Sequence, residues 1–381
     1  MREGWTYVSF GDIMTPAKVE RCGKRIDLPI LSITMRSGII LQNDRFKKKI
    51  ASFDTKDYKI VKNGQLVIAF PIDEGLIYTQ DIADQGIMSP AYSIWDVDYS
   101  NHNRRFLSYL FHSPFAMNYY KSKLRGTTQR RRMLPKEDLL SFPIPVPPLS
   151  EQQRIVSELD LLSSIIEKKK AQLKEYDQLA QSIFYDMFGD PVTNEKGWEV
   201  KEIESIGECI SGGTPSRNNP QFFTGDINWF SAGELNKLFL DDSIEKITKE
   251  ALESSSAKLC KPMSLFIGMY DTAAFKLGIA TKASASNQAC ANVSLFNDNV
   301  VWFYYTLFLM REEALKHRHG ARQKNLNLGY IKGFKVPLPP LPLQQSFASK
   351  IEAIERQKAL IQQSIAEVQM LFDSRMDDWF A

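Results

Sequence analysis

The segment FPIPVPPLSEQQ occupies residues 142–153, and a second version of it, FKVPLPPLPLQQ, occupies residues 334–345. The two copies lie 192 positions apart, which is about half of the 381-residue chain. Each copy follows a stretch of mixed, strand-like sequence and precedes a long amphipathic pattern. A repeat of this size indicates two tandem units, each with a globular part and a helix.

The repeat extends beyond this segment. Gly4-Trp5 near the start of the chain returns as Gly197-Trp198, so we expect the second unit to begin close to residue 191. Towards the end of each globular part, residues 126–130 (GTTQR) match residues 320–324 (GARQK). The sequences between these landmarks differ strongly, as expected for domains that share a scaffold and bind different targets.

Both long patterns have the alternating four-residue and three-residue spacing of a coiled coil. Three charged residues, Lys169, Lys358 and Arg375, occupy positions in this spacing, and we expect them to extend to solvent or to help fix the register. The apolar residues predicted to form the helix–helix interface are Ile155, Leu159, Leu162, Ile166, Leu173, Tyr176, Ile183, Phe347, Ile351, Ile354, Ile361, Ile365, Val368 and Phe372.

The ends of both helices have sequence signals. Ser150 and Gln153 have the spacing of a capping box, Pro342 suits the first turn of the second helix, and Gly189-Asp190-Pro191 predicts the end of the first. A helix of roughly 37 residues is about 55 Å long, longer than a globule of this size is wide. We therefore expect the two helices to pair antiparallel, although each apolar stripe could instead pack on its own globule.

The predicted fold class is α/β in the mixed α+β sense, with two globular domains separated by two long antiparallel coiled-coil helices in a pseudo-twofold tandem repeat. Strands are expected near residues 65–70, 91–95 and 264–269, and helices near 104–120 and 302–317. The predicted domains are residues 1–145 (first globule), 146–189 (central helix), 190–336 (second globule) and 337–381 (distal helix).

Composition narrows the class of protein. With 43% hydrophobic and 24% charged residues, the chain has the composition of a folded globular protein. Its start lacks a signal-peptide pattern and its apolar runs are short, so we expect a cytoplasmic protein. The four cysteines have no metal-ligand spacing, which favours buried, reduced thiols and no metal site.

Positive charge is clustered although the net charge is only +3. Clusters at residues 121–132 and 316–324 fall at equivalent places in the two repeats, just before the proline-rich segments. Two different globules at the ends of a long spacer would suit two separated patches on duplex DNA, whose helical turn is about 34 Å. The segment 211–218 (SGGTPSRN) is the best candidate for a loop that contacts DNA.

Motifs for catalysis are missing from the sequence. It has no Walker motif, no G-x-S-x-G elbow and no H-E-x-x-H pair. Residues 218–222 (NNPQF) are a poor match to the Asn-Pro-Pro-aromatic signature of amino-methyltransferases, because Gln221 replaces the second proline. We therefore predict no catalytic residues in this chain.

These features together resemble the specificity subunit of type I restriction-modification systems over essentially the full length. The resemblance rests on Pro147–Gln153 and Pro339–Gln345, the two Gly-Trp pairs, the Gly-Gly-Thr-Pro at 212–215, the Gly-x-x-Gln near each globule's end and Asn287-Gln288-Ala289. The first globule departs from the pattern, since Thr15-Pro16 lacks the glycine pair and Met88-Ser89-Pro90 replaces the second globule's Gln288-Ala289-Cys290.

The resemblance implies a DNA-binding subunit without catalytic activity of its own. Each globule, a target-recognition domain, would recognise one half of a bipartite, asymmetric site in double-stranded DNA, while the helices set the gap. Two modification subunits would methylate adenine with S-adenosylmethionine, and restriction subunits would use ATP and Mg; the chain itself would need no cofactor. The expected DNA contacts are Gly126, Thr128, Gln129, Arg130, Gly213, Thr214, Ser216, Arg217, Gly320, Arg322 and Gln323.

Two alternatives stay open at the level of sequence. The chain could be the recognition subunit of a different methylation or restriction effector, or a coiled-coil scaffold whose two globules bind proteins. Self-association is possible in each case, because exposed seams can pair between chains as well as within one.

Overall fold

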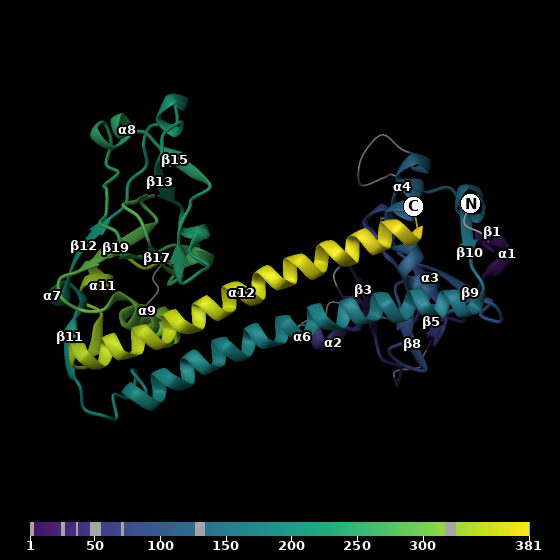
Figure 1. Ribbon diagram of the computed structural model, residues 1–381, viewed down its shortest axis with the longest axis horizontal. Helices are drawn as coiled ribbons and strands as arrows, with labels where there is room; N and C mark the ends of the chain where they lie inside the picture. The colour runs from purple at the N-terminus through teal and green to yellow at the C-terminus, as the bar shows by residue number, and fades with distance from the viewer. Residues whose placement is uncertain are drawn as a thin grey trace. The chain divides into compact units, whose positions relative to one another are not determined.

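The computed structural model describes residues 4–23, 27–35, 37–45, 55–69, 72–125, 134–316 and 325–380. The chain divides into two compact units: unit 1 comprises residues 1–170 and 363–381, and unit 2 comprises residues 171–362. Each unit contains a globular head and part of both long helices, α6 (Leu149–Phe188) and α12 (Leu341–Phe380) (Figure 1). Among the described residues, no helix is long and apolar enough to cross a membrane.

The head of unit 1 has a four-stranded antiparallel sheet in the order β2-β9-β6-β7, with the two-stranded ladders β1–β10, β3–β4 and β5–β8. Its elements are β1 (Thr6–Ser9), α1 (Phe10–Ile13), β2 (Met14–Pro16), β3 (Leu31–Thr34), β4 (Gly38–Leu41), α2 (Gln42–Arg45), β5 (Lys59–Lys62), β6 (Leu66–Ile68), β7 (Ile77–Thr79), β8 (Gln85–Met88), β9 (Ser93–Val97), α3 (Arg104–Phe111), α4 (Pro114–Lys123), α5 (Lys136–Leu140) and β10 (Pro143–Val146).

The head of unit 2 has a five-stranded sheet in the order β12-β19-β16-β17-β14, a three-stranded sheet in the order β15-β13-β18 and the ladder β11–β20. Its elements are β11 (Glu199–Glu202), α7 (Ile203–Ile206), β12 (Gly207–Ser211), β13 (Ile227–Phe230), β14 (Phe239–Leu240), β15 (Glu245–Ile247), α8 (Lys249–Glu253), β16 (Ser264–Gly268), β17 (Leu277–Ala280), β18 (Ala285–Ser286), β19 (Cys290–Leu295), α9 (Val300–Leu309), α10 (Arg311–Lys316), α11 (Leu328–Lys332) and β20 (Lys335–Leu338).

The proline-rich segments are edge strands rather than plain linkers. β10 pairs with β1, the first strand of unit 1, and β20 pairs with β11, the first strand of the second head. The same backbone bond closes both ladders: the N–H of Phe10 donates to Phe142 O at 2.8 Å, and that of Ile203 donates to Phe334 O at 3.1 Å. A two-stranded edge tolerates proline because its outer N–H groups need no partner strand. Each head is thus closed at the point where its long helix begins.

The start of α6 differs from the predicted capping box. The helix begins at Leu149, so Ser150 lies inside it, and the carbonyl of Pro148 accepts the N–H groups of Glu151 and Gln152 at 2.9 and 3.0 Å. The side chain of Gln153 accepts from Asn103 Nδ2 at 3.0 Å instead of returning to the helix terminus. The prediction of a capping box was wrong because a contact with the head competes for the same side chain.

The end of α6 lies where the glycine predicted it. The helix stops at Phe188, and Gly189 adopts a φ of 75°, the left-handed conformation that glycine adopts without strain. Trp198 Nε1 donates to Phe188 O at 2.9 Å, and Lys196 Nζ donates to Asp186 O at 2.6 Å. The second Gly-Trp pair therefore helps to terminate the first long helix.

Both long helices contribute to the core of each head. In unit 1, Ile155 and Leu159 of α6 pack in one cluster with Met376 and Phe380 of α12 and with the head residues around Phe106. In unit 2, a cluster around Trp302 includes residues of both helices: Ala180, Phe184 and Phe188 of α6, and Phe347, Ala348, Ile351 and Ile354 of α12. The two packing modes that the sequence left as alternatives therefore coexist, because each helix contacts a head as well as the other helix.

The predicted fold class is confirmed. Short helices lie in both ranges where they were expected. Near residues 104–120, α3 ends at Phe111, and α4 starts at Pro114 with the Ser113 hydroxyl accepting from Ala116 N–H. Near residues 302–317, the two helices are α9 and α10. Proline favours the first turn of a new helix, and this cap was present in the sequence.

The four cysteines, Cys22, Cys209, Cys260 and Cys290, are buried free thiols, as predicted. Burial raises the pKa of Cys209 and Cys260 to about 11 and that of Cys290 to about 12. These three side chains are therefore protonated at neutral pH and pack as small apolar groups.

Candidate nucleic-acid interface

The predicted Gly-Gly-Thr-Pro segment follows β12 and crosses the end of β18 in unit 2. Gly212 N–H donates to Cys290 O at 3.0 Å, and Gly213 N–H donates to Ser286 O at 2.9 Å. A Cβ atom on Gly213 would lie 2.2 Å from the backbone carbon of Ser256, and one on Gly212 would lie 2.2 Å from Asn287 O. Only glycine fits at these two positions, because other backbone segments occupy the space of a side chain.

This close passage brings Thr214 to the turn that follows β18. The Thr214 hydroxyl donates to the side-chain oxygen of Gln288, and the Gln288 side chain is exposed. The turn itself is braced by Asn287, whose N–H donates to Phe230 O at 3.0 Å and whose Oδ1 accepts from Ala289 N–H at 3.1 Å. An amide that accepts one hydrogen bond still has two N–H donors and one acceptor lone pair to offer, a set that can pair bidentately with adenine.

Arg217 occupies an aromatic and acidic corner three residues further on. Its guanidinium binds both oxygens of Glu245, with Nη1–Oε1 at 2.5 Å and Nη2–Oε2 at 2.8 Å. The guanidinium carbon also lies 4.1 Å from the ring centre of Phe223 and 5.2 Å from that of Trp229. The hydrogen bonds from Arg217 lower the pKa of Glu245, so this carboxylate stays ionised and holds the cation in an exposed position.

The remaining predicted DNA contacts divide into two groups. Ser216 is exposed, and its carbonyl accepts from Asn219 N–H at 3.2 Å in the turn that presents Arg217. The other seven lie outside the described residues: Gly126, Thr128, Gln129, Arg130, Gly320, Arg322 and Gln323. The structure thus gathers Gly213, Thr214, Ser216 and Arg217 around Gln288 and Glu245, two neighbours that spacing along the chain did not connect to them.

All the residues predicted for the helix–helix interface are buried or half-buried. Lys358 and Arg375, the charged members of the second seam, form ion pairs between the helices: Lys358 Nζ lies 2.8 Å from Asp177 Oδ1, and Arg375 Nε binds Glu158 Oε1. In unit 2, Asp177 of α6 pairs with Lys358 of α12. Phe188 lies later in α6 and contacts Phe347, which lies earlier in α12. This order shows that the helices run antiparallel.

A second set of buried helix positions is absent from the predicted seam. Val156, Phe184 and Phe188 of α6 are at most 5% exposed, and the residues 192 positions later, Ala348, Met376 and Phe380, are at most 6% exposed. These residues lie near the helix ends, where the heads pack. Comparison of the two repeats could have identified them, because all three pairs are apolar at equivalent positions.

The repeated glutamine before each seam holds a head helix to a long helix. Gln152 is fully buried; its Oε1 accepts from Asn103 N–H at 2.7 Å, and its Nε2 donates to Pro147 O at 3.0 Å. In unit 2, Gln344 Oε1 accepts from Asn299 N–H at 2.8 Å, and Nε2 donates to Pro339 O at 2.8 Å. Asn103 and Asn299 cap α3 and α9, so the same joint occurs in both units.

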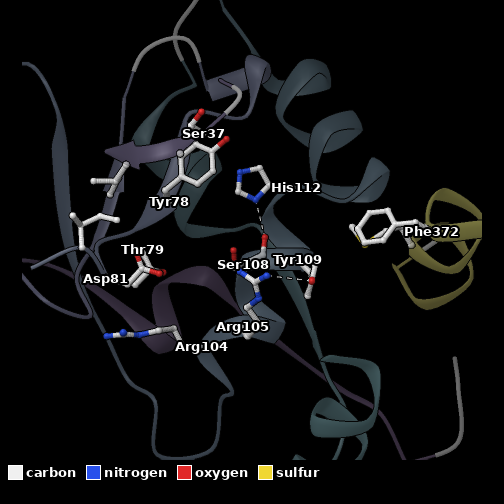
Figure 2. A pocket seen from close by; sticks show the side chains of 14 residues that line it. Ser37, Tyr78, Thr79, Asp81, Arg104, Arg105, Ser108, Tyr109, His112 and Phe372 are labelled. Atoms are coloured by element: carbon white, nitrogen blue, oxygen red, sulfur yellow. Dashed lines mark hydrogen bonds between the residues drawn. The ribbon is translucent and has the colours of Figure 1, made fainter. Parts of the chain in front are cut away.

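A cavity of about 520 Å³ in unit 1 lies between α3, the strands β4 and β7, and the end of α12 (Figure 2). On its wall, Arg105 Nε lies 2.8 Å from Asp160 Oδ1, and the Tyr109 hydroxyl donates to the same oxygen at 2.6 Å. His112 has its two ring nitrogens 2.7 Å from Ser108 O and 3.1 Å from Gly75 O. The bonds to Asp160 join α3 to α6, and the contact of His112 with Gly75 O joins the end of α3 to the rest of the unit 1 head.

Unit 2 has a cavity of about 670 Å³ at the equivalent place, between α9, β14 and both long helices. Its wall includes Tyr304, Tyr305 and Phe308, which stand 196 positions after Ser108, Tyr109 and His112 of the first cavity. The spacing equals that between the helix caps Asn103 and Asn299. The two units therefore both have a cavity beside this helix, and the residues that line it differ.

A family model described as the type I restriction modification DNA specificity domain matches residues 3–175 and 195–370 of this chain. The two matched segments correspond to the two repeats, and together they include most of the chain.

Curated relatives are similar to a shorter stretch. The specificity subunit of the type I restriction enzyme EcoR124I/EcoR124II from Escherichia coli is 24% identical over 267 residues, which are 66% of this chain and 64% of that protein. The specificity subunit of the type I restriction enzyme MjaIX from Methanocaldococcus jannaschii is 25% identical over 268 residues, 65% of this chain and 62% of that protein. The chain thus matches less than two thirds of the length of either relative.

A solved structure described as the structural basis of complex assembly and conformational transition of the type I R-M system is similar in fold. Its TM-score is 0.61 at 17% identity, covering 100% of this chain and 98% of that chain. The similarity shows a shared fold.

Proposed function

Because the chain belongs to the family of type I restriction modification DNA specificity domains, we propose that it recognises DNA for a type I restriction-modification complex. Each head binds one half of a bipartite, asymmetric site in double-stranded DNA. The predicted division into two target-recognition domains, residues 1–145 and 190–336, and two helical segments, residues 146–189 and 337–381, is part of this proposal.

The duplicated scaffold with unlike loops is the observation that carries the proposal. The edge ladder, the glutamine joint and the cavity recur at equivalent places in both units. The Gly-Gly-Thr-Pro loop of unit 2 has no equivalent in unit 1, where Thr15-Pro16 follows a different sequence. A protein that recognises two different half-sites needs this combination of constant framework and variable contacts.

The exposed loops supply the chemistry that DNA recognition requires. Gln288, oriented by Thr214, is suited to an adenine, and Arg217 is suited to a phosphate or a guanine. Gly126, Thr128, Gln129, Arg130, Gly320, Arg322 and Gln323 are proposed as further contacts, since both segments are basic and recur just before the proline-rich strands. Changing Arg130 or Arg322 to alanine should weaken binding and flatten its salt dependence.

The long helices set the gap between the half-sites and bind two modification subunits. Two copies of one partner need two equivalent surfaces, and apolar side chains are exposed at equivalent helix positions. Leu149 and Leu341 are 54% and 37% exposed, and Leu179 and Leu371 are 46% and 50% exposed. Restriction subunits complete the complex.

The chain acts without a cofactor or catalytic residues of its own in this proposal. The modification subunits use S-adenosylmethionine to methylate adenine, and the restriction subunits use ATP and Mg²⁺. The purified chain alone should therefore neither methylate nor cleave DNA, whereas the chain with its modification subunits should methylate adenine.

Mapping of methylated adenines in the host genome tests the proposal. A split motif with a constant gap, which disappears when the gene for this chain is deleted, is the expected result. An electrophoretic shift assay with that motif, with and without modification subunits, then measures specific binding. Retention of all methylated motifs after deletion, or equal affinity for a scrambled duplex, would contradict the proposal.

A further inference from the structure

One end of the three-stranded sheet in unit 2 collects loops from several segments. β13 is antiparallel to β15 and parallel to β18, and Trp229 is aligned with Glu245 on one side and Ala285 on the other. The residues just before β15 and just after β18 therefore lie at the same end of the sheet. We call this the loop edge, defined by Thr214, Arg217, Ile244 and Gln288.

Ile244 is the apolar member of the loop edge. Its side chain is 86% exposed, more than any other large apolar side chain among the described residues. Single exposed apolar residues are common on protein surfaces, so exposure alone says little. The position becomes informative because Ile244 shares one end of the sheet with polar side chains suited to DNA and because hydrogen bonds hold its backbone.

Side chains on both sides of Ile244 fix its backbone. Its N–H donates to Glu234 Oε1 at 2.8 Å, while Glu234 Oε2 accepts the N–H and hydroxyl of Ser231 at 2.8 and 2.7 Å. The buried hydroxyl of Ser243 accepts Trp229 N–H at 3.0 Å and donates to Glu245 O at 2.6 Å. A β-branched side chain on such a backbone has few rotamers, so Ile244 is presented outward with little freedom to lose on binding.

Two acidic side chains of this region, Glu245 and Asp242, form ion pairs. Glu245 binds Arg217, Asp242 lies 2.8 Å from Lys246 Nζ, and Asp241 accepts from the Thr281 hydroxyl at 2.9 Å. The two ion pairs reduce the repulsion that a phosphate backbone would meet, whereas Glu234 and Asp241 accept hydrogen bonds from neutral donors and keep their charge. The loop edge thus offers an exposed apolar side chain together with hydrogen-bonding groups and the Arg217–Glu245 pair.

We propose that Ile244 contacts the C5 methyl group of a thymine in the major groove of the half-site bound by the second head, an inference that rests on the proposed function. The thymine methyl is the apolar feature that distinguishes A·T pairs in that groove, and apolar side chains recognise it. Every half-site with a methylated adenine contains at least one thymine, on the opposite strand. Ile244 therefore contributes to specificity by packing on a methyl group, and Gln288 contributes by hydrogen bonding to a base.

The test uses the full chain bound to its modification subunits and the motif found by methylation mapping. Each thymine of the motif is replaced in turn by deoxyuridine, which keeps the base pair and removes only the methyl group. Dissociation constants are measured for the native chain, for Ile244→Ala and for Phe296→Ala. Phe296 is the matched control, because it is a 62% exposed apolar residue of unit 2 outside the loop edge.

Loss of one buried methyl contact weakens binding about fourfold. The native chain and Phe296→Ala should show this loss at one thymine, whereas Ile244→Ala should bind the thymine and deoxyuridine duplexes equally. Absence of any deoxyuridine effect for the native chain, or its persistence in Ile244→Ala, would overturn the inference. Failure of the proposed function would look different, since the native chain would then not distinguish the motif from a scrambled duplex.

Discussion

The side-chain oxygen of Gln152 accepts the backbone N–H of Asn103 at 2.7 Å, which ties the cap of α3 to the first turn of α6. The side-chain nitrogen of Gln152 donates to Asn101 O at 3.1 Å and to Pro147 O at 3.0 Å. The three bonds use both ends of one fully buried amide. A head element and a helix element thus meet at a residue that the sequence repeats at position 344.

Gln152→Ala should destabilise unit 1 by about 2–4 kcal/mol, because it leaves a buried N–H and two carbonyl groups without their partner. The neighbouring Gln153→Ala removes one exposed hydrogen bond and should cost less than about 0.5 kcal/mol. Denaturant unfolding, monitored by hydrogen exchange of the α3 backbone amides, measures the loss of stability in both variants. Equal stability of the two variants would show that the buried amide does not hold the joint.

Gly213→Ala should disrupt the loop that presents Thr214 and Arg217. Its Cβ would lie 2.2 Å from the backbone of Ser256, and relief of such overlap costs about 1–3 kcal/mol. Specific DNA binding should fall together with the stability of unit 2. Gly233→Ala is the control, since its nearest neighbour would be Ser231 Oγ at 3.8 Å. Matching losses in both variants would contradict the role of the close passage at Gly213.

Arg217→Ala should weaken DNA binding and reduce the slope of log affinity against log salt by about 0.9, the value for one phosphate contact. Arg154→Ala is a matched control: Arg154 also binds a carboxylate, Glu151, at 2.7 Å and stacks over the Trp379 ring at 4.7 Å. Its removal should leave the slope unchanged. Binding isotherms at several salt concentrations measure this slope for both variants. An unaltered slope for Arg217→Ala would show that Arg217 does not contact a phosphate.

Gln288→Ala and Thr214→Val should each reduce discrimination between the cognate motif and a motif with one altered base. A bidentate contact contributes about 1–3 kcal/mol of discrimination, so Gln288→Ala should lose roughly tenfold or more. The double variant should lose little beyond Gln288→Ala alone, because Thr214 acts by orienting the amide. Additive losses in the double-mutant cycle would show that the two side chains act independently.

Stability should fall in acid through Glu158. The hydrogen bond from Arg375 lowers the pKa of Glu158 below its ordinary value of 4.5. A carboxyl whose folded-state pKa is lowered adds stability above its unfolded pKa and loses it as the pH falls towards the folded value. Glu158→Gln should therefore have a lower melting temperature than the native chain at pH 7. The difference between the two melting temperatures should disappear as the pH falls below about 4.5. Glu167→Gln, at an exposed pair with Lys170, is the control; a constant gap from pH 7 to pH 3 would exclude this linkage.

Several features could be predicted because they depend on local pattern. The seam from Ile155 onward and its copy from Phe347 followed from spacing, and the end of α6 followed from Gly189. The start of α6 could not be predicted in the same way. Ser150 and Gln153 have the spacing of a capping box, but Gln153 bonds to Asn103, which lies 50 residues earlier in the chain.

The candidate site was predictable only in part for the same reason. The glycine pair at 212–213 indicated a close approach of backbone segments, whereas nothing in the chain order connects Thr214 with Gln288 or Arg217 with Glu245. Strand pairing around β13 brings these partners together from positions 28 and 74 residues apart. Ile244 is likewise one isoleucine among many until the sheet places it at the loop edge.

The sequence by itself determined the duplication, the two long helices and the residues along their seam, because a periodic pattern specifies which face of a helix is apolar. The tertiary structure alone decided which end of each helix enters a head, how Gln152 and Gln344 form the joints, and which side chains share the loop edge. These outcomes depend on contacts between residues far apart in the chain, and the spacing of residues along a segment contains no information about such partners.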